Sequence, residues 1–198
     1  KNMMHTAKYM HQILNLALPA YDELFSDIDI SGLVESKGII YFWTKNDLKS
    51  RELEINIRNE LGVKQQLLTR HEIHDLEPHI KKVYHAGVLY PNARHTRNPK
   101  KILLKLFDLF LKRGGHFKRQ NAQSISFTSD NKPVIKTDSN FYTFDKAVIA
   151  CGAFSKKLTD QVDEKIPLDT ERGYHVHFRG HDHLLSRPVI FLNKGFGI

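Results

Sequence analysis

The segment FDKAVIACGAFS, residues 144–155, decides how the fold of this chain is interpreted. Its apolar run Ala147–Ala150 has the length of a short strand and leads directly into the small residues Cys151, Gly152 and Ala153. A short, continuous apolar run bounded by turn residues is typical of a strand that is buried on both faces. Such strands belong to parallel sheets, which helices cover on either side. We therefore predict a parallel-sheet strand that ends in a small-residue turn.

Before this segment, helix-like and strand-like stretches alternate along the chain. Apolar residues recur at helical spacing over Met3–Phe25, where Pro19 should break or kink the helix. A later helix starts at Asn98-Pro99 and ends at Gly114-Gly115, because proline suits the first helical position and glycine the C-terminal cap. Thr69 and Glu72 have the spacing of a capping box. The other expected elements are strands over Gly38–Trp43, Val63–Leu67 and Val83–Tyr90, and a helix that is capped by Thr44 or Asn46 and ends at Leu61.

After Gly115 the chain changes to short strands joined by turns. Four such strands come before the segment quoted above, over Phe117–Arg119, Ser124–Thr128, Pro133–Thr137 and Phe141–Phe144. Two more follow it, over Tyr174–Phe178 and Pro188–Leu192. The sequence therefore predicts strands and helices in one chain, with no internal repeat.

Composition and charge exclude several classes of protein. Hydrophobic residues make up 40% of the 198 residues and charged residues 26%, which is ordinary for a globular chain with a buried core. The formal net charge is +8, but no block of about five or six like charges occurs, so we expect no nucleic-acid partner. The single cysteine, Cys151, cannot form an internal disulfide, which fits a reducing cytosolic compartment. No apolar run has the length of a membrane span.

Three segments carry a resemblance to a known family through their order and spacing. They are GVLYPNARHTRNP at residues 87–99, FDKAVIACGAFS at residues 144–155 and IPLDTERGYH at residues 166–175. Together they resemble the D-amino-acid oxidase superfamily of FAD-dependent oxidoreductases, and within it the D-amino-acid dehydrogenase branch. The resemblance extends over about residues 30–178.

The resemblance implies two domains, between which the chain crosses more than once. We expect residues 1–92 in a substrate-binding domain with a mixed or antiparallel sheet and helices, residues 93–168 in an incomplete FAD-binding Rossmann-like domain, and residues 169–198 in the substrate-binding domain again. The expected fold class is α+β / α/β. The family's Gly-x-Gly-x-x-Gly segment, which holds the pyrophosphate, does not occur here. We therefore expect an internal fragment that binds FAD weakly or not at all and is itself inactive.

The resemblance also names cofactor-binding residues. The run Ala150, Cys151, Gly152, Ala153 and Phe154 matches a second flavin contact of the family, where small residues let the backbone approach the dinucleotide. Ala122 takes the place of a family residue whose backbone meets the adenine. The alternatives are a plain strand-to-loop turn for the run and an ordinary strand residue for Ala122.

Five residues are candidates for contact with a small amino-acid substrate, namely His95, Arg172, Tyr174, His175 and Tyr41. By resemblance, His95 lies near the junction of the domains, and the other residues except Tyr41 lie on a strand that passes close to the active site. Arg172 could pair a carboxylate through two parallel hydrogen bonds, or form a salt bridge between domains. The alternatives are a bond to a loop carbonyl for His95 and core packing for Tyr41. We identify no catalytic residue.

Several histidines near the end of the chain raise the question of a metal site. His175 and His177 would share one face of a strand, and His181, Asp182 and His183 follow closely. A metal site needs three or four converging ligands, each held in place by further hydrogen bonds. We interpret these side chains as exposed residues around a turn and predict no metal.

The resemblance implies oxidative deamination of D-amino acids, with hydride transfer from Cα to FAD and release of a keto acid and ammonia. It also implies a bacterial enzyme of amino-acid catabolism that is cytoplasmic, is peripheral on the inner face of the cytoplasmic membrane and passes electrons to an acceptor at that membrane. One alternative is a related flavoenzyme for N-methyl amines, glycine, proline or 2-hydroxy acids. A second is a non-catalytic α+β binding domain. The sequence leaves the substrate and the oligomeric state open.

Overall fold

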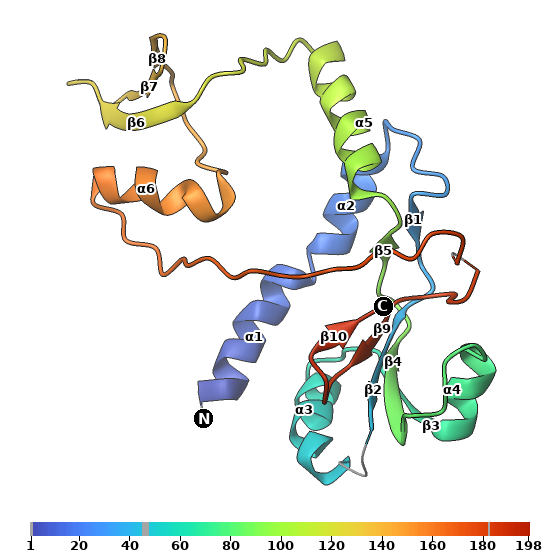
Figure 1. The fold of residues 1–198 in the computed structure, drawn as a ribbon. Helices are drawn as coiled ribbons and strands as arrows, with labels where there is room; N and C mark the ends of the chain where they lie inside the picture. The colour runs from blue at the N-terminus through green and yellow to red at the C-terminus, as the bar shows by residue number, and fades with distance from the viewer. Residues whose placement is uncertain (1, 45–47, 182) are drawn as a thin grey trace. The chain divides into compact units, whose positions relative to one another are not determined.

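The computed structural model describes residues 2–44, 48–181 and 183–198 of the chain (Figure 1). Two residues with expected roles lie outside these ranges. They are Asn46, expected as an alternative helix cap, and Asp182, considered as a metal ligand. The account that follows concerns the described residues.

The chain divides into two compact units, and each is described by itself. Unit 1 comprises Lys1–Gly115 and Phe178–Ile198, and unit 2 comprises His116–His177. The domain boundaries expected from the sequence lie after residues 92 and 168. Which part of the chain serves the substrate and which the cofactor stays a prediction.

Two helices, α1 (Asn2–Leu14) and α2 (Ala17–Phe25), form where the sequence predicts one interrupted helix. The interruption comes before Pro19, at Asn15 and Leu16, and Pro19 itself lies in the first turn of α2. That position suits proline because the first amides of a helix have no partner inside the helix. The proline therefore belongs to the start of the second helix and does not bend a continuous one.

Unit 1 is built on a five-stranded mixed sheet with the strand order β10–β9–β2–β4–β3. Strand β9 runs parallel to β2, and the other neighbouring pairs are antiparallel. Figure 1 shows α3 (Leu48–Glu60) and α4 (Arg70–Leu76) on opposite sides of this sheet. The strands are β2 (Ile39–Trp43), β3 (Gln66–Thr69), β4 (Ala86–Tyr90), β9 (Val189–Phe191) and β10 (Phe196–Gly197).

The core of unit 1 lies on the face of the sheet that α4 covers. Ile40 and Phe42 of β2 are fully buried there, in one cluster with Ile73 of α4. Gly87 of β4 allows the close approach, since a Cβ at this position would lie 2.8 Å from the Tyr41 carbonyl oxygen and 3.2 Å from Ile73 Cδ1. A larger residue at position 87 would therefore push the helix and the neighbouring strand away.

The helix ends predicted from local signals are confirmed. The Glu72 amide donates to Thr69 Oγ1 (3.3 Å), and the Thr69 amide donates to the Glu72 carboxylate (2.7 Å), so α4 begins with a capping box. Helix α5 (Pro99–Lys112) begins where the Asn98 side chain accepts a hydrogen bond from the Lys101 amide at 3.0 Å. Each cap supplies a partner for a helix amide that would otherwise have none.

Unit 2 consists of a three-stranded antiparallel sheet followed by short helices. The sheet has the order β6–β7–β8 and comprises β6 (Ala122–Phe127), β7 (Pro133–Thr137) and β8 (Phe141–Thr143). After it come the 3-10 helix η1 (Gly152–Phe154), α6 (Ser155–Thr159) and a second 3-10 helix, η2 (Asp160–Val162). Gln161 fastens the helices to the sheet, because its Oε1 accepts from the Ile125 amide at 3.2 Å and its Nε2 donates to the Gln123 carbonyl at 3.3 Å.

Three strands predicted from the sequence are wrong. The stretches Phe117–Arg119, Ala147–Ala150 and Tyr174–Phe178 have no strand structure, and the side chains of Val148 and Tyr174 are 90% and 87% exposed. A strand requires a neighbouring backbone that satisfies its amides and carbonyls. Within the described residues no strand pairs with these segments. An apolar or alternating pattern reports which side chains favour burial, and it does not supply the partner.

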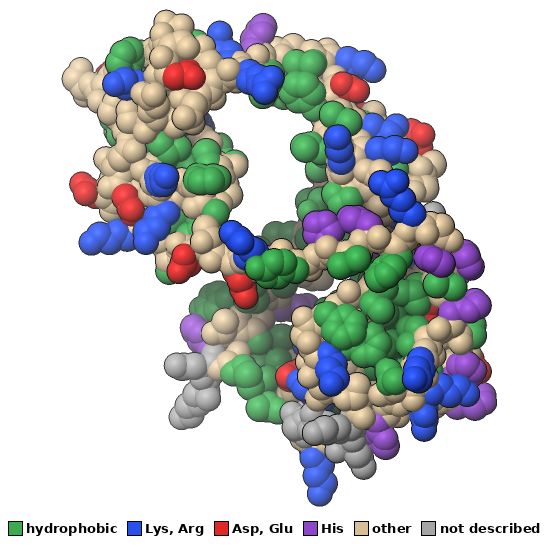
Figure 2. All heavy atoms as spheres, viewed as in Figure 1, with side chains coloured by type: hydrophobic (Ala, Val, Ile, Leu, Met, Phe, Trp, Pro, Cys, Tyr) green, Lys and Arg blue, Asp and Glu red, His purple; other side chains and the backbone are tan. Residues whose placement is uncertain are grey.

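The basic residues are distributed over the surface. Figure 2 shows Lys and Arg side chains at many separate places on the visible face of the molecule, interspersed with acidic ones. Hydrophobic side chains also reach the surface, among them Val148, Phe154 and Leu103. Among the described residues, no helix combines the length and the apolar character that crossing a membrane would require.

Candidate functional site

A pocket of about 300 Å³ in unit 2 brings together residues that the sequence analysis named separately. Ala122, at the start of β6, and Cys151, directly after the run Ala147–Ala150, both line it. Lys146 and Val148 also line the pocket, which is therefore apolar apart from one cationic side chain. The two segments that the family resemblance assigns to the cofactor therefore meet at one place.

The turn beside this pocket has a backbone conformation that favours glycine. Gly152 has φ +55°, and no atom lies within 4 Å of the position that a Cβ would occupy. The Cys151 amide donates to Ser155 Oγ at 3.1 Å, and the Phe154 amide donates to the Cys151 carbonyl at 3.1 Å. The turn is thus held by its own hydrogen bonds, while Cys151, Gly152 and Ala153 remain exposed to solvent. It offers open backbone to a ligand.

Two residues of this site were not assigned a role from the sequence, namely Ser155 and Lys146. Ser155 is buried and orients the Cys151 amide. A hydroxyl residue at the first position of α6 was the sequence signal that could have indicated this role. Lys146 precedes the apolar run directly, and its side chain could neutralise part of an anionic ligand.

His95 lies in unit 1, in the two-stranded ladder of β1 (Val34–Glu35) with β5 (His95–Thr96). Its Nε2 is 3.9 Å from Glu35 Oε2, while Lys37 Nζ (3.2 Å) and Arg97 Nη1 (2.9 Å) also contact that carboxylate. Hydrogen bonding to Lys37 is the main cause that holds the pKa of Glu35 below its usual value, and Arg97 contributes in the same direction. Within the described residues, the buried Nδ1 of His95 has no hydrogen-bond partner, so the expected alternative of a loop carbonyl is not seen.

His95 also lines an apolar pocket of about 400 Å³ between α2 and the start of α5. Val34 and Ile102 lie on the same lining, and so does Arg94, whose guanidinium is paired with Asp22. The side chain is therefore placed at the edge of an apolar space, and its role toward a substrate stays a prediction.

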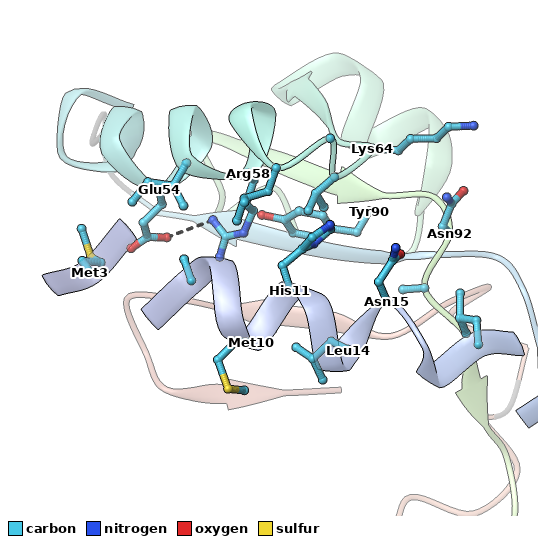
Figure 3. Close-up of a pocket in the computed structure, with 17 residues that line it drawn as sticks. Met3, Met10, His11, Leu14, Asn15, Glu54, Arg58, Lys64, Tyr90 and Asn92 are labelled. Carbon is cyan, nitrogen blue, oxygen red and sulfur yellow. Dashed lines mark hydrogen bonds and ion pairs between the residues drawn. The ribbon is translucent and has the colours of Figure 1, made fainter. Parts of the chain in front are cut away.

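Tyr41 of β2 is half-buried and packs edge-on against Tyr90, with ring centroids 5.5 Å apart. Tyr90 in turn borders a pocket of about 600 Å³ between α1, α3 and β4, which Figure 3 shows in close-up. The Arg58 guanidinium lies 5.4 Å from the centre of the Tyr90 ring and bonds Glu54 at 3.4 Å. Burial is the main cause that raises the pKa of the Tyr90 hydroxyl. The sequence analysis missed this pocket because its walls come from segments far apart in the chain.

Arg172, Tyr174 and His175 lie in unit 2, in the stretch that leads to its end at His177. This stretch has no regular structure and all three side chains are exposed. The expected strand over Tyr174–Phe178 is therefore absent, and with it the alternation of Tyr174 and His175 between two faces of a sheet. The structure does not gather these residues around a ligand, and their role toward a substrate stays a prediction.

The histidine rings near the end of the chain contact other histidine rings, but the described residues form no metal centre. The rings of His175 and His177 lie 4.9 Å apart, and those of His79 and His183 lie 6.4 Å apart. In residues 2–44, 48–181 and 183–198, no group of three His, Cys, Asp or Glu side chains could hold a metal ion.

Comparison with known proteins gives the class of the protein. A family model described as DAO, FAD dependent oxidoreductase, matches residues 3–197. A D-amino-acid oxidase of Bradyrhizobium diazoefficiens is 28% identical over 171 residues, which cover 86% of this chain and 41% of that protein. This chain therefore belongs to the DAO family of FAD-dependent oxidoreductases.

Solved structures support the fold. Glycine oxidase from Geobacillus kaustophilus has a TM-score of 0.67 at 18% identity, over 95% of this chain and 50% of that one. Iminodiacetate oxidase from Chelativorans sp. BNC1 has a TM-score of 0.72 at 12% identity, over 93% and 52%. The expected α+β / α/β class is confirmed, and the chain spans about half the length of the proteins it matches or less.

FAD is the cofactor of this family, as the resemblance implied. The small-residue turn after Ala150 fits a dinucleotide, because its backbone is exposed and Gly152 leaves open space where a side chain would stand. Lys146 fits the charge of a phosphate-bearing ligand. The residues present thus suit the group that the family uses.

Proposed function

We propose that this chain is part of an enzyme that oxidatively deaminates D-amino acids, and that the turn Cys151–Phe154 is one of the surfaces that hold its FAD. The observation that carries the proposal is the meeting of Ala122 and Cys151 at one pocket beside a glycine turn with exposed backbone. Membership of an FAD-dependent family supports the cofactor, and the similarity to a D-amino-acid oxidase supports the substrate class.

In this proposal each cofactor residue acts through its small size or its backbone. Ala122 and Ala153 leave room for the ligand, and Gly152 adopts a left-handed conformation in a turn that is exposed to solvent. The Ser155 hydroxyl accepts a hydrogen bond from the Cys151 amide and so holds the turn in this conformation in the absence of the ligand. Ala150 and Phe154 bound the turn on its two sides.

FAD, when bound, supplies the acceptor for a hydride that leaves the substrate Cα. The chain's own candidates bind and orient the substrate. In unit 2, Arg172 would hold the substrate carboxylate through two parallel hydrogen bonds, and Tyr174 or His175 would confine the substrate side chain. In unit 1, His95 and Tyr41 are the candidates for contact with the substrate. The imine that leaves the site is hydrolysed by water to a keto acid and ammonia.

A membrane acceptor for the electrons and a cytoplasmic location at the inner face of the membrane belong to the same proposal. The basic character of the chain supports them, because a net charge of +8 favours an anionic surface. Oxygen as the acceptor is the alternative, and the experiment below distinguishes the two.

The test uses the full-length parent protein with FAD and a panel of D- and L-amino acids, glycine, N-methyl amines, proline and 2-hydroxy acids. Turnover is followed once with an artificial electron acceptor and once with oxygen alone. The proposal predicts keto acid and ammonia from D-amino acids, with the artificial acceptor preferred. Turnover of another substrate class without any D-amino acid would contradict the substrate, and a preference for oxygen would contradict the membrane acceptor.

A further inference from the structure

Glu77 is a buried carboxylate in unit 1 that the function above does not use. It follows the last residue of α4 and is only 1% exposed. A buried charge is costly unless it is paired and its oxygens accept hydrogen bonds. A carboxylate at this position beside the apolar core therefore needs hydrogen-bond and ion-pair partners to offset its desolvation.

The partners of Glu77 come from a segment 109 residues further along the chain. One carboxylate oxygen accepts a hydrogen bond from the Ser186 amide at 2.9 Å. The other oxygen accepts hydrogen bonds from the Ser186 hydroxyl and from Arg187 Nε, the latter at 3.1 Å. Arg187 Nη1 then donates to the Lys37 carbonyl at 3.0 Å. One carboxylate thus joins the end of α4, the residues before β9 and the residues before β2.

The place of this cluster determines what it can do. The Ile40 amide of β2 donates to the Pro188 carbonyl at 3.1 Å, directly after Arg187, and β9 then pairs with β2 in parallel. Strand β9 has only three residues, and its pattern of two buried side chains around a half-buried one carries little information about register. A slip by two residues keeps the same side chains facing the core and moves the strand by roughly 6.6 Å.

We propose that Glu77 is a positioning residue that sets the register of β9 against β2. The Ser186 amide and hydroxyl and the Arg187 guanidinium can reach its two oxygens together only when Val189 lies opposite Ile40. In a slipped register the carboxylate and the guanidinium would both be buried without partners, which the low-dielectric core penalises. The cluster therefore selects one register out of those that the apolar pattern allows.

This register has a consequence for the reaction, and that step rests on the proposed function. Ile190 of β9 lies opposite Tyr41 of β2, which is a candidate for contact with the substrate in the same unit. A slip of β9 by two residues would place Leu192 beside Tyr41 instead, and a misplacement of about 1 Å can already lower a rate by roughly a hundredfold.

The register can be measured in the chain itself by disulfide trapping in a Cys151→Ser background. Tyr41 and Ile190 lie opposite each other in the native register, whereas Tyr41 and Leu192 would do so after a slip by two residues. Each pair is replaced by cysteines, since a bridge forms only when the two Cα atoms lie within about 7 Å. The proposal predicts that the native pair is oxidised at least about tenfold faster than the slipped pair.

The decisive variant is Glu77→Leu combined with Arg187→Met, because replacing a buried ion pair by apolar residues of similar size is often neutral for stability. We expect a folded chain in which the two cysteine pairs oxidise at rates within about threefold of each other. A folded double variant that keeps the full tenfold preference would overturn the proposal, since a purely stabilising role leaves the register unchanged.

Two further variants secure the test. Ser186→Ala removes one hydroxyl donor and keeps the Arg187 pair, so it should fold and show an intermediate preference. Asp75→Asn changes an exposed carboxylate on the same helix and should leave the preference at its original value. An unchanged preference in Ser186→Ala, or a reduced one in Asp75→Asn, would count against Glu77 as the register determinant.

The consequence for the reaction is tested in the FAD-loaded full-length parent. The double variant at Glu77 and Arg187 should keep its FAD content and lose at least about a hundredfold in kcat/KM for the D-amino acid that the wild type oxidises. Unchanged kcat/KM would refute the link to the substrate. A wild type without amine-oxidising activity would refute the proposed function instead, and the disulfide result would stand independently.

Discussion

Two apolar runs of similar length, Gly38–Trp43 in unit 1 and Ala147–Ala150 in unit 2, have opposite fates. The first contains β2, the middle strand of five, and its Ile40 and Phe42 are fully buried. The second has no strand partner within the described residues, and its Val148 is 90% exposed. The difference lies in the neighbouring strands, because β4 and β9 flank β2, while none of the described strands flanks the other run. An apolar run thus predicts a tendency to be buried, and the rest of the chain decides whether it is.

The largest expected effect compares one residue from each run. Phe42→Ala should lower the free energy of unfolding by about 4 kcal/mol, because it removes a fully buried ring and leaves a cavity. Val148→Ala should change it by less than about 0.5 kcal/mol, because the side chain already contacts solvent. Urea denaturation followed by circular dichroism measures both variants, and the fluorescence of the buried Trp43 reports on unit 1 in addition. Similar losses in the two variants would show that Val148 is buried in solution.

A second comparison places the same backbone strain at two sites. Gly152 and Gly62 both have positive φ, at +55° and +71°, and neither has an atom near the position of a Cβ. Alanine at either position should cost about 1–2 kcal/mol of local strain. In the full-length parent, only Gly152→Ala should weaken FAD binding. If the turn changes its conformation to relieve the strain of the alanine, FAD can bind only when that strain is restored, which lowers the affinity by about tenfold. Equal FAD affinity in the two variants, measured by flavin fluorescence, would remove the turn from the cofactor site.

A smaller effect is expected at the capping box of α4, which lies next to the core of unit 1. Thr69→Ala removes the oxygen that accepts the Glu72 amide and should cost about 1 kcal/mol. Thermal denaturation of the chain measures the loss, and Thr96→Ala is the control, since Thr96 is an exposed threonine of the same unit that lies outside a helix cap. A loss in Thr96→Ala as large as that in Thr69→Ala would contradict a specific contribution of the cap.

The smallest effect concerns pH. Hydrogen bonds from the Thr69 amide and hydroxyl lower the pKa of Glu72 below 4.5 in the folded chain. Because the folded pKa is depressed, the cap's contribution is complete above the unfolded pKa and is lost as the pH falls from about 4.5 through the folded value. The variant Glu72→Gln should therefore show a weaker loss of stability over this range than the wild type. The same acid dependence in both would contradict the capping box.

Local features of the fold were predictable from the sequence because their signals lie within a few residues. The capping box at Thr69 and the start of α5 after Asn98 are confirmed at the predicted residues. Pairings between distant segments were not predictable in the same way. Nothing near Val189 indicates that it will lie parallel to Ile40, and nothing near Glu77 indicates Ser186 as its partner.

The candidate site divides along the same line. The small-residue turn after Ala150 was recognisable because its residues are consecutive, and its glycine does adopt a positive φ. The pocket that Cys151 and Ala122 line together depends on how β6 lies relative to the run Ala147–Ala150, and no local sequence pattern indicates that arrangement. Tyr174 and His175 show the converse, since an alternating pattern predicted a strand where the described chain provides no partner.

The most direct test of the central claim uses the exposed thiol of Cys151, which lies in the turn proposed to hold FAD. The rate of its alkylation is measured by mass spectrometry in the full-length parent, with and without FAD, and in the 198-residue chain. The account predicts rapid alkylation in the chain alone with or without FAD, because we expect this chain to bind FAD weakly or not at all. In the parent, FAD should slow the reaction at least about tenfold by covering the turn. The same rate in the parent with and without FAD would contradict the placement of the cofactor at Cys151–Phe154.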